Sequence, residues 1–275
     1  HDVNDKEGIR SNSIYSLLVD DRGAVWVGHF QAGLDYSLYQ NGLFRTYAYP
    51  PLFNSANLSI RSFVNRGQEK VIGSRDGLFY INEATGVVKS FVKPVLTSDL
   101  ILTISFYQGE YYIGTYGGGM MVLNPGTLSL KYFAQGDTEL FQKGHIFCVK
   151  PDAKGNLWIG TSQGLFCYNG QTKQIKHFTS ANSQLPEGNV YEVSFDSTGK
   201  GWIATETGMC IYDPASQSLR SNVFPEGFVH RDKVRTIYED AGHNLYFIRE
   251  KGSLFTSTLT MDRFQNRSIF STLPD

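Results

Sequence analysis

The chain has 275 residues, 41% of them hydrophobic, and its 25 basic and 26 acidic side chains give a formal net charge of -1. A chain of this length buries about three quarters of the surface that its unfolded form exposes, so a sizeable core is expected. The balanced charge argues against a nucleic-acid partner and against an anionic membrane surface. The longest apolar run, residues 100–107, is far shorter than the roughly 18 residues of a membrane span, so no direct membrane insertion is expected.

The predicted elements are short strands that build the same hairpin repeatedly. The first copy has strands at 13–21, 24–29 and 33–39, separated by turns, and Phe44 marks a fourth strand. Five copies follow in chain order, with strands at 58–65, 70–74 and 77–82; 100–107, 111–115 and 119–124; 145–152, 156–161 and 164–169; 189–196, 201–205 and 208–213; and 233–240, 245–249 and 252–257. Their fourth strands are marked by Phe91, Phe133, Phe178, Phe224 and Phe264.

The copies stay in phase along the whole chain. One marker residue in each second strand recurs every 41 to 46 positions, at Gly28, Gly73, Gly114, Gly160, Ala204 and Ile248. Strands rich in Val, Ile, Tyr and Phe between Gly, Asn and Asp indicate an all-β protein. Four antiparallel strands in about 44 residues are typical of one β-propeller blade. The sequence therefore predicts a β-propeller of six four-stranded antiparallel blades, forming a closed ring or an open arc.

Each blade buries its apolar faces only against its neighbours, which explains why one hairpin recurs. We expect a single propeller domain over residues 1–275, or a segment of a longer array, with blades at roughly 9–52, 53–95, 96–138, 139–183, 184–228 and 229–275. The first strand of each blade is expected to lie innermost. Its third position is mostly small (Ser16, Ser62, Thr103, Cys148, Glu192, Thr236) and its fourth is always apolar (Leu17, Phe63, Ile104, Val149, Val193, Ile237).

These units resemble the two-component regulator propeller repeat, which has the approximate pattern N-x-V, D-x-x-G, W-I-G-T and G-L-x-x-Y. The first and fifth copies follow it with Trp26 and Trp202, whereas the second, third and sixth lack the Trp. The sixth also has Ile248 in place of the small residue. The fourth copy carries the pattern almost whole, in Asp152, Gly155, Trp158, Ile159, Gly160, Thr161, Gly164, Leu165 and Tyr168.

The resemblance implies a non-catalytic sensor segment of a Bacteroidetes hybrid histidine kinase and response regulator, located in the periplasm and involved in sensing oligosaccharides. It implies neighbouring propeller and β-sandwich domains of the same chain as partners, an oligosaccharide ligand, and a homodimer of the full-length receptor. Kinase activity is expected only elsewhere in that receptor. No cofactor is expected, and signalling is expected to shift the populations of rigid propeller arrangements.

Two short motifs suggest an enzyme, but their context favours turns. Residues 160–164 match the G-x-S-x-G nucleophile elbow, which needs a helix after the serine, whereas a strand is predicted here. The position of Ser162 is occupied by Arg75, Tyr116 and Glu206 in other copies, so the hydroxyl is not required. Residues 117–119 are three glycines without the Lys-Ser/Thr of a phosphate-binding loop, and a tight turn is expected.

The remaining candidate groups are also interpreted as structural. Aspartates precede the first turn of four copies, where an Asx turn is favoured over a calcium loop. The three Trp are expected in the core between blades. The cysteines, Cys148, Cys167 and Cys210, lie in apolar strands and are expected to be core residues rather than disulfide partners. The histidines lack metal-binding spacing, so no metal site is predicted.

One end of the predicted blades is the candidate ligand or partner face, because loops on a rigid scaffold carry binding residues. The second position of the inner strands and the turns after the second strands lie at this end. Tyr and Arg in this mixture suit a sugar or a protein surface. The candidate residues are Tyr15, His29, Arg61, Arg75, Tyr116, His145, Tyr191, Glu206 and Arg235.

Two alternative functions stay open. One is a propeller enzyme, similar to a streptogramin lyase or a sugar-lactone hydrolase, which would place His, acidic groups or a metal at the axis. The positions predicted to face the axis are mainly Ser, Thr and Cys, and Glu192 is their one carboxylate. The other is a propeller that only binds other proteins.

Overall fold

The computed structural model describes residues 8–9, 11–20, 23–37, 44–46, 58–133, 138–221, 233–249, 254–258 and 264–267. These residues form six four-stranded antiparallel sheets and one short helix. In every sheet the strands lie side by side in chain order, as consecutive hairpins. The prediction of an all-β fold built from four-stranded antiparallel sheets is confirmed. Phe224 and His230 lie outside the described residues.

The chain divides into two compact units, His1–His145 and Ile146–Asp275. Unit 1 contains three sheets: β1 Ile14–Val19, β2 Val25–His29, β3 Leu34–Ser37 and β4 Phe44–Thr46; β5 Ile60–Arg66, β6 Glu69–Ser74, β7 Leu78–Asn82 and β8 Val87–Phe91; and β9 Ile101–Tyr107, β10 Glu110–Thr115, β11 Met120–Asn124 and β12 Ser129–Tyr132. It also contains helix α1, Thr138–Lys143.

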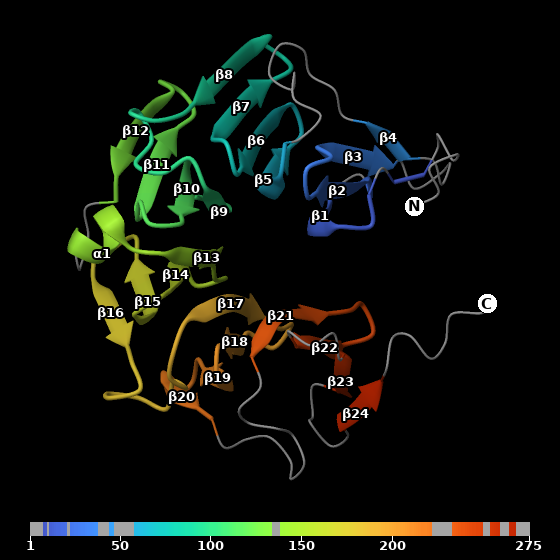
Figure 1. Ribbon diagram of the computed structural model, residues 1–275. Helices are drawn as coiled ribbons and strands as arrows, with labels where there is room; N and C mark the ends of the chain where they lie inside the picture. The colour runs from blue at the N-terminus through green and yellow to red at the C-terminus, as the bar shows by residue number, and fades with distance from the viewer. Residues whose placement is uncertain are drawn as a thin grey trace. The chain divides into compact units, whose positions relative to one another are not determined.

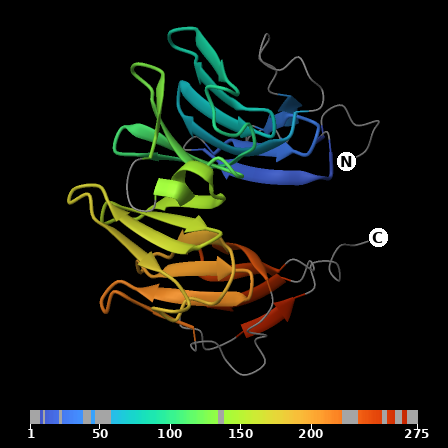
Figure 2. The same cartoon turned by 60° about the vertical axis from the view of Figure 1, so that its left-hand side comes forward.

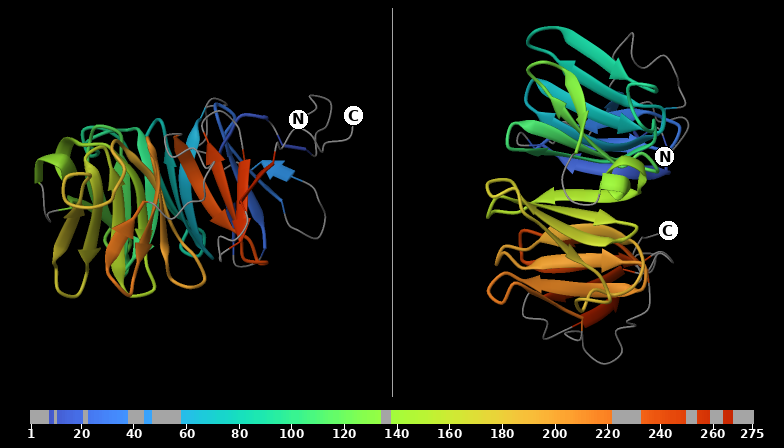
Figure 3. Two further views of the ribbon diagram at one scale, coloured as in Figure 1. Left: turned by 90° about the horizontal axis from the view of Figure 1, so that it is seen from below. Right: turned by 90° about the vertical axis from the view of Figure 1, so that its left-hand side faces the viewer.

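Unit 2 contains the other three sheets: β13 Ile146–Pro151, β14 Asn156–Thr161, β15 Gly164–Asn169 and β16 Ile175–Phe178; β17 Val190–Phe195, β18 Gly201–Thr205, β19 Gly208–Asp213 and β20 Ser218–Arg220; and β21 Val234–Glu239, β22 Asn244–Arg249, β23 Leu254–Thr258 and β24 Phe264–Arg267. Figures 1 and 2 show the sheets of each unit as successive layers, and Figure 3 shows this layering from two further directions. Closure of the six sheets into a ring stays a prediction.

The core of unit 1 lies between successive sheets. Trp26 and Leu34 of the first sheet pack in one buried cluster with Ile60, Ile72 and Phe79 of the second. The second cluster joins the second and third sheets in the same way, and includes Val71, Tyr80, Ile101, Ile104, Ile113 and Met121. Each sheet therefore covers the apolar face of the next one, as expected for propeller blades.

The core of unit 2 follows the same plan. Trp158 packs in a cluster with Val190 and Val193, and Trp202 packs in another with Ile237 and Phe247. Trp26, Trp158 and Trp202 are each no more than 3% exposed. The prediction that the three Trp form core between blades is therefore confirmed within the two units.

Among the described residues, helix α1 is an element that the sequence pattern did not predict. It has only six residues, too few for a helical hydrophobic period to be visible. Leu140 and Phe141 are buried, and the Phe141 ring packs edge-on against Phe133 with 5.0 Å between centroids. Tertiary packing of these two side chains therefore stabilises this short helix.

Every inner strand carries a β-bulge at its second residue. The registers of β1, β5, β9, β13, β17 and β21 with their partners each skip one position after the first pair. A bulge leaves one residue outside the ladder and redirects its side chain. The six redirected residues are Tyr15, Arg61, Leu102, Phe147, Tyr191 and Arg235.

The side chain at the fourth position of the inner strand is more exposed in the first sheet than in the later ones. Ile104, Val149, Val193 and Ile237 are at most 6% exposed, as the alternation predicts. Leu17 of β1 is 65% exposed. Within unit 1 no described sheet precedes β1–β4, so no sheet of the same unit covers this position.

Candidate functional site

In unit 2, the bulge residues of successive sheets contact one another. The Phe147 ring meets the Tyr191 ring edge-on, with 5.2 Å between centroids. The guanidinium carbon of Arg235 lies 4.5 Å from the centroid of the same Tyr191 ring. The three inner strands of unit 2 thus present a continuous row of contacting planar groups, Phe147, Tyr191 and Arg235, which we call the unit 2 shelf.

Further polar groups border the unit 2 shelf. Lys233 Nζ lies 5.1 Å from the centroid of the Tyr191 ring. Asn189 donates a hydrogen bond from Nδ2 to the Tyr191 hydroxyl at 3.1 Å. The Glu206 carboxylate accepts a hydrogen bond of 3.4 Å from the backbone N–H of Asn189. Tyr191, Glu206 and Arg235 were predicted as site residues, and the structure places all three near one end of these strands.

Unit 1 repeats part of this arrangement. The Arg61 guanidinium carbon lies 4.6 Å from the centroid of the Tyr15 ring. Tyr15 is 46% exposed, and its ring also meets Phe30 edge-on at 5.3 Å between centroids. Both Tyr15 and Arg61 were predicted, whereas Phe30 was not. Its contact with Tyr15 makes it part of the same surface.

The turns after the second strands lie beside the start of the inner strands, as predicted. The backbone N–H of Arg75 donates to the carbonyl of Ser59, and that of Tyr116 donates to the carbonyl of Leu100. Phe30 makes the equivalent bond to the carbonyl of Ser13. Phe30 therefore occupies the turn position of Arg75 and Tyr116, one residue after the position that the sequence analysis assigned in the first copy.

Tyr116 and His145 form a second aromatic pair in unit 1. Their rings stack with 4.0 Å between centroids and 26° between planes. Tyr116 is half exposed, and His145 follows the short helix α1. The two residues were predicted on one face from separate loops, and the structure brings them into direct contact. Arg75 is exposed in its turn.

The prediction for His29 is wrong. His29 is the last residue of β2, is fully buried, and contacts Asp35 with 2.9 Å between Nε2 and Oδ2. The equivalent residues Thr115, Thr161 and Thr205 donate their hydroxyl to the backbone carbonyl of the following turn. His29 thus replaces a buried turn residue and lies within the blade rather than on its exposed end.

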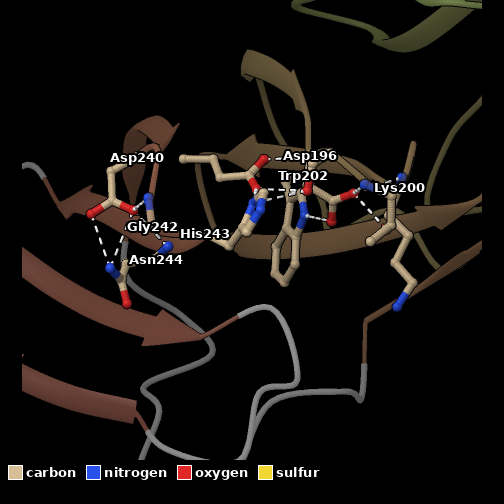
Figure 4. Close-up of polar contacts among 10 residues, drawn as sticks. Asp196, Lys200, Trp202, Asp240, Gly242, His243 and Asn244 are labelled. Carbon is tan, nitrogen blue, oxygen red and sulfur yellow. Dashed lines mark hydrogen bonds and ion pairs between the residues drawn. The ribbon is translucent and has the colours of Figure 1, made fainter.

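The recurring aspartates of the hairpin turns are structural acceptors. Asp196 Oδ1 accepts the backbone N–H groups of Thr198 and Lys200 at 2.9 and 3.0 Å, and its Oδ2 accepts Trp202 Nε1 at 2.8 Å. Figure 4 shows Asp196 with Lys200 and Trp202. In the same way, Asp20 Oδ2 accepts a hydrogen bond from Trp26 Nε1, and Asp152 Oδ2 accepts one from Trp158 Nε1. These bonds form the Asx-type turn that was favoured over a calcium loop.

The sixth copy keeps this turn with a tyrosine in place of the Trp. Asp240 Oδ1 accepts the N–H groups of Gly242 and Asn244 at 2.9 and 2.8 Å, as seen in Figure 4, and Oδ2 accepts the Tyr246 hydroxyl at 2.9 Å. Hydrogen bonds from the Asn244 side chain and backbone lower the pKa of Asp240 to about 2. The carboxylate is therefore stabilised in its charged form by the turn itself.

Ser197, Glu239 and His243 form an exposed cluster between the second and third sheets of unit 2. Glu239 Oε1 lies 2.7 Å from His243 Nδ1 and 2.9 Å from Ser197 Oγ. The same Nδ1 lies 3.1 Å from Ser197 Oγ. A serine hydrolase triad needs one imidazole nitrogen for the acid and the other for the serine. The geometry therefore indicates an inter-sheet contact rather than a nucleophile.

Ser162 also lies in a turn without the geometry of a nucleophile elbow. Strand β15 begins at Gly164, directly after the turn, and no helix follows the serine. Thr161 Oγ1 donates to the Gly164 carbonyl at 2.8 Å and accepts the Gln163 N–H at 3.0 Å. Gly164 has a φ of 110°, which glycine adopts without strain. The G-x-S-x-G match is thus a hairpin turn.

Glu192, the one carboxylate among the predicted axis positions, forms an ion pair with Lys150 of the neighbouring inner strand. Lys150 Nζ and Glu192 Oε1 lie 3.4 Å apart. Burial raises the pKa of Glu192, and the nearby Glu192 charge raises the pKa of Lys150. Burial also raises the pKa of the Cys167 thiol to about 12, and it raises those of Cys148 and Cys210. All three cysteines are free thiols.

The described part of the chain contains no group of three or more His, Cys, Asp or Glu placed to hold a metal ion. Among the same residues, no helix has the length and apolar composition of a membrane span.

Comparisons with known proteins identify the repeat. The family described as "Two component regulator propeller" matches residues 8–31 and 141–163, which belong to the first and fourth copies. These two copies carry Trp26 and Trp158, two of the residues on which the resemblance was based. The resemblance to this repeat is thus confirmed. No curated protein sequence matches the chain.

Solved structures support the propeller fold. The extracellular domain of the putative hybrid two component system BT3049 from B. thetaiotaomicron has a TM-score of 0.70 and 21% identity, over 94% of this chain and 40% of that chain. The corresponding domain of BT4673 from the same organism has a TM-score of 0.60 and 15% identity, over 91% and 44%. YCF48, solved with a D1 peptide, has a TM-score of 0.69 and 12% identity, over 97% and 85%. This chain spans less than half the length of the two extracellular domains.

Proposed function

We propose that this chain, which carries two-component regulator propeller repeats, is a non-catalytic segment of the periplasmic sensor region of a hybrid two-component receptor. The observation that carries the proposal is the family match in two separate copies, together with four-stranded sheets that follow the same period along the chain. The likeness in fold to extracellular domains of putative hybrid two component systems agrees with it. Histidine kinase activity then belongs to another part of the receptor.

The proposed stimulus is an oligosaccharide. The Tyr and Arg side chains at the ends of the inner strands support a sugar ligand, since aromatic rings pack on sugar faces and guanidinium groups bind their oxygen atoms. Neighbouring propeller and β-sandwich domains of the same receptor, and a second receptor copy, are the proposed structural partners. The ligand acts by binding one arrangement of these rigid parts more tightly than another, which shifts their populations.

The non-catalytic role is supported by the chemistry of the candidate groups. Ser162 lies in a hairpin turn, and Glu192 is paired with Lys150. Ser197 and Glu239 contact the same nitrogen of His243. None of these three arrangements provides an activated nucleophile, which argues against the lyase-like or lactonase-like alternative.

A protein partner is the second candidate function. YCF48, which has a similar fold, was solved with a D1 peptide. The exposed Tyr15, Tyr116 and Arg235 side chains are also of the types that dominate protein interfaces. The sensor role is favoured because the repeat itself matches the regulator family.

The proposed function is tested with the complete receptor in membrane vesicles. Phosphate incorporation is measured after addition of individual oligosaccharides of plant and host origin. We expect one class of oligosaccharide to change phosphorylation in a saturable way while the sugar is recovered unchanged. Turnover of the sugar by this chain, or phosphorylation that no oligosaccharide changes, contradicts the proposal.

A further inference from the structure

Strand β1 of unit 1 carries a row of exposed apolar side chains, which we call the β1 surface. Leu17 and Val19 are 65% and 64% exposed, and Ile14 and Tyr15 are 41% and 46% exposed. All four lie within one strand of six residues. Apolar side chains gathered in this way on a folded protein mark a surface that a partner covers, because their burial is favourable.

The equivalent positions in the third sheet of unit 1 show what kind of element covers them. Ile101 takes the position of Ile14, and Ile104 takes that of Leu17. Both are at most 6% exposed, since they pack in one buried cluster with Leu78 of the preceding sheet. The β1 surface therefore continues the type of interface that joins successive sheets of this unit, and it suits an apolar strand.

Arg61 places a positive charge beside the β1 surface. Its guanidinium carbon lies 4.6 Å from the centroid of the Tyr15 ring. Nε of this half-buried side chain is buried without a hydrogen-bond partner, and among the described residues no carboxylate pairs with the guanidinium. The neighbouring turn contributes Arg75 and Asp76, whose opposite charges offset each other. A partly buried cation without an acceptor indicates that the partner supplies an anionic group.

We propose that the β1 surface docks an apolar strand of another domain of the receptor, and that an acidic side chain of this strand pairs with Arg61. Apolar side chains of the partner cover Ile14, Leu17 and Val19. The carboxylate binds the guanidinium beside the Tyr15 ring, where a charge-assisted pair fixes the register of the two strands. Tyr and Arg are the residue types that dominate interface energies. The assignment of the partner to the same receptor rests on the proposed function.

The test compares thiol labelling in the isolated chain and in the complete receptor. Leu17→Cys and Val19→Cys are each introduced into both proteins, and the rate of reaction with a maleimide is measured by mass spectrometry. The unsubstituted proteins give the background from the native cysteines. We expect fast labelling of both variants in the isolated chain, and labelling at least about tenfold slower in the receptor, where the partner excludes the reagent.

Charge reversal tests the role of Arg61. In the receptor, Arg61→Glu is expected to raise the labelling rate of Leu17→Cys about tenfold, the effect of losing one charge-assisted contact. Arg235→Glu is the matched control, because Arg235 lies on a tyrosine ring from the equivalent bulge in unit 2. It is expected to leave the rate within about twofold. Thermal unfolding of each variant verifies that the fold is kept.

Three results overturn the proposal. Slow labelling of the isolated chain at every concentration means that the chain itself covers β1, and slow labelling that is relieved by dilution means that a second copy does. Equal rates in the isolated chain and the receptor, for both thiol variants, mean that no domain docks there. Equal effects of Arg61→Glu and Arg235→Glu refute the ion pair.

The result is separable from that of the proposed function. A receptor that responds to an oligosaccharide, but in which β1 is labelled as fast as in the isolated chain, keeps the sensor role and refutes the docking surface. A receptor that no oligosaccharide stimulates, but in which Arg61 is required for protection of β1, supports the docking surface and refutes the sensor role.

Discussion

At the scale of single residues, one carboxylate organises the first hairpin turn in four of the six copies. Asp196 is 7% exposed, and it accepts backbone N–H groups with one oxygen and the Trp202 indole with the other. The Trp in turn fills the core between two sheets. The turn and the core of the blade are thus connected through one side chain, which accounts for the recurrence of Asp and Trp six positions apart.

Replacement of Asp196 by Ala tests this connection. It leaves the buried Trp202 Nε1–H without its acceptor and removes the cap of the turn, so we expect a loss of about 2–4 kcal/mol in the free energy of unfolding. Urea titration of the variant measures this loss. Asp76→Ala, at an exposed position in another turn, is the control and is expected to change stability by less than about 0.5 kcal/mol. Equal effects of the two substitutions would contradict the argument.

The buried pair of His29 and Asp35 gives a second prediction. His29→Thr restores the residue type of Thr115 but leaves the Asp35 carboxylate buried without this partner. Loss of the hydrogen bond between these two buried side chains is expected to cost about 1–3 kcal/mol. The double variant His29→Thr and Asp35→Met introduces the residue types of Thr115 and Met121, which occupy the equivalent positions in the third sheet, and we expect it to recover most of the loss. A double variant as unstable as His29→Thr would show that the pair is not the cause.

Acid stability provides a third prediction. The folded-state pKa of Asp240 is about 2, below its ordinary value of 3.8. Burial pushes the pKa of Glu239 up, but hydrogen bonds from His243 and Ser197 outweigh it and lower the pKa overall. A carboxylate whose pKa is lowered by folding stabilises the fold at any pH above its ordinary, unfolded-state pKa. This contribution is lost as the pH falls through the lowered pKa.

We therefore expect stability to fall between about pH 4 and pH 2, and less steeply in Asp240→Asn. Urea midpoints measured at intervals over this range check the slope. A slope that the substitution leaves unchanged would mean that Asp240 makes no measurable contribution.

At the scale of strands and sheets, the repeated hairpin was predictable because its pattern of apolar strands and Gly-containing turns is local. Gly73 illustrates the packing that this repetition provides. A Cβ atom at Gly73 would lie 2.4 Å from Ile101 Cγ2 in the next sheet. The small residue that marks the repeat therefore permits close approach of successive sheets within unit 1.

Gly73→Ala tests this close approach. We expect destabilisation by about 1–3 kcal/mol from overpacking against Ile101. Gly126→Ala is the matched control, because its Cβ would meet only Asn124 Oδ1, at 3.3 Å, and an effect below about 0.5 kcal/mol is expected. Thermal unfolding distinguishes the two outcomes, and a neutral Gly73→Ala would show that the sheets separate at little cost.

The parts of the candidate site that were not predicted from the sequence depend on one-residue shifts in strand register or turn position, and on side-chain packing. The bulge at the second inner position was invisible, because a register skip leaves no mark in the alternation of residue types. His29 was chosen in place of the adjacent Phe30, although Phe30 follows the marker Gly28 by two positions, as Arg75 follows Gly73. The backbone bond from Phe30 to Ser13 identifies the same turn position. Lys233 was missed because it precedes the strand, although its charge beside Tyr191 is a signal that a search of flanking residues would have found.

At the scale of the molecule, the six sheets divide into two compact units, each with its own cores between sheets. Unit 1 carries the Tyr15–Arg61 and Tyr116–His145 pairs, and unit 2 carries the shelf around Tyr191. The described contacts among the candidate residues thus lie within each unit, and the single face that the sequence predicts stays a prediction.

The most direct test of the sensor role is phosphate incorporation into the complete receptor, measured with increasing concentrations of individual oligosaccharides. The account predicts a saturable change in phosphorylation with an oligosaccharide that is recovered intact. Phosphorylation that stays constant across all oligosaccharides, or a sugar that the chain consumes, would contradict it.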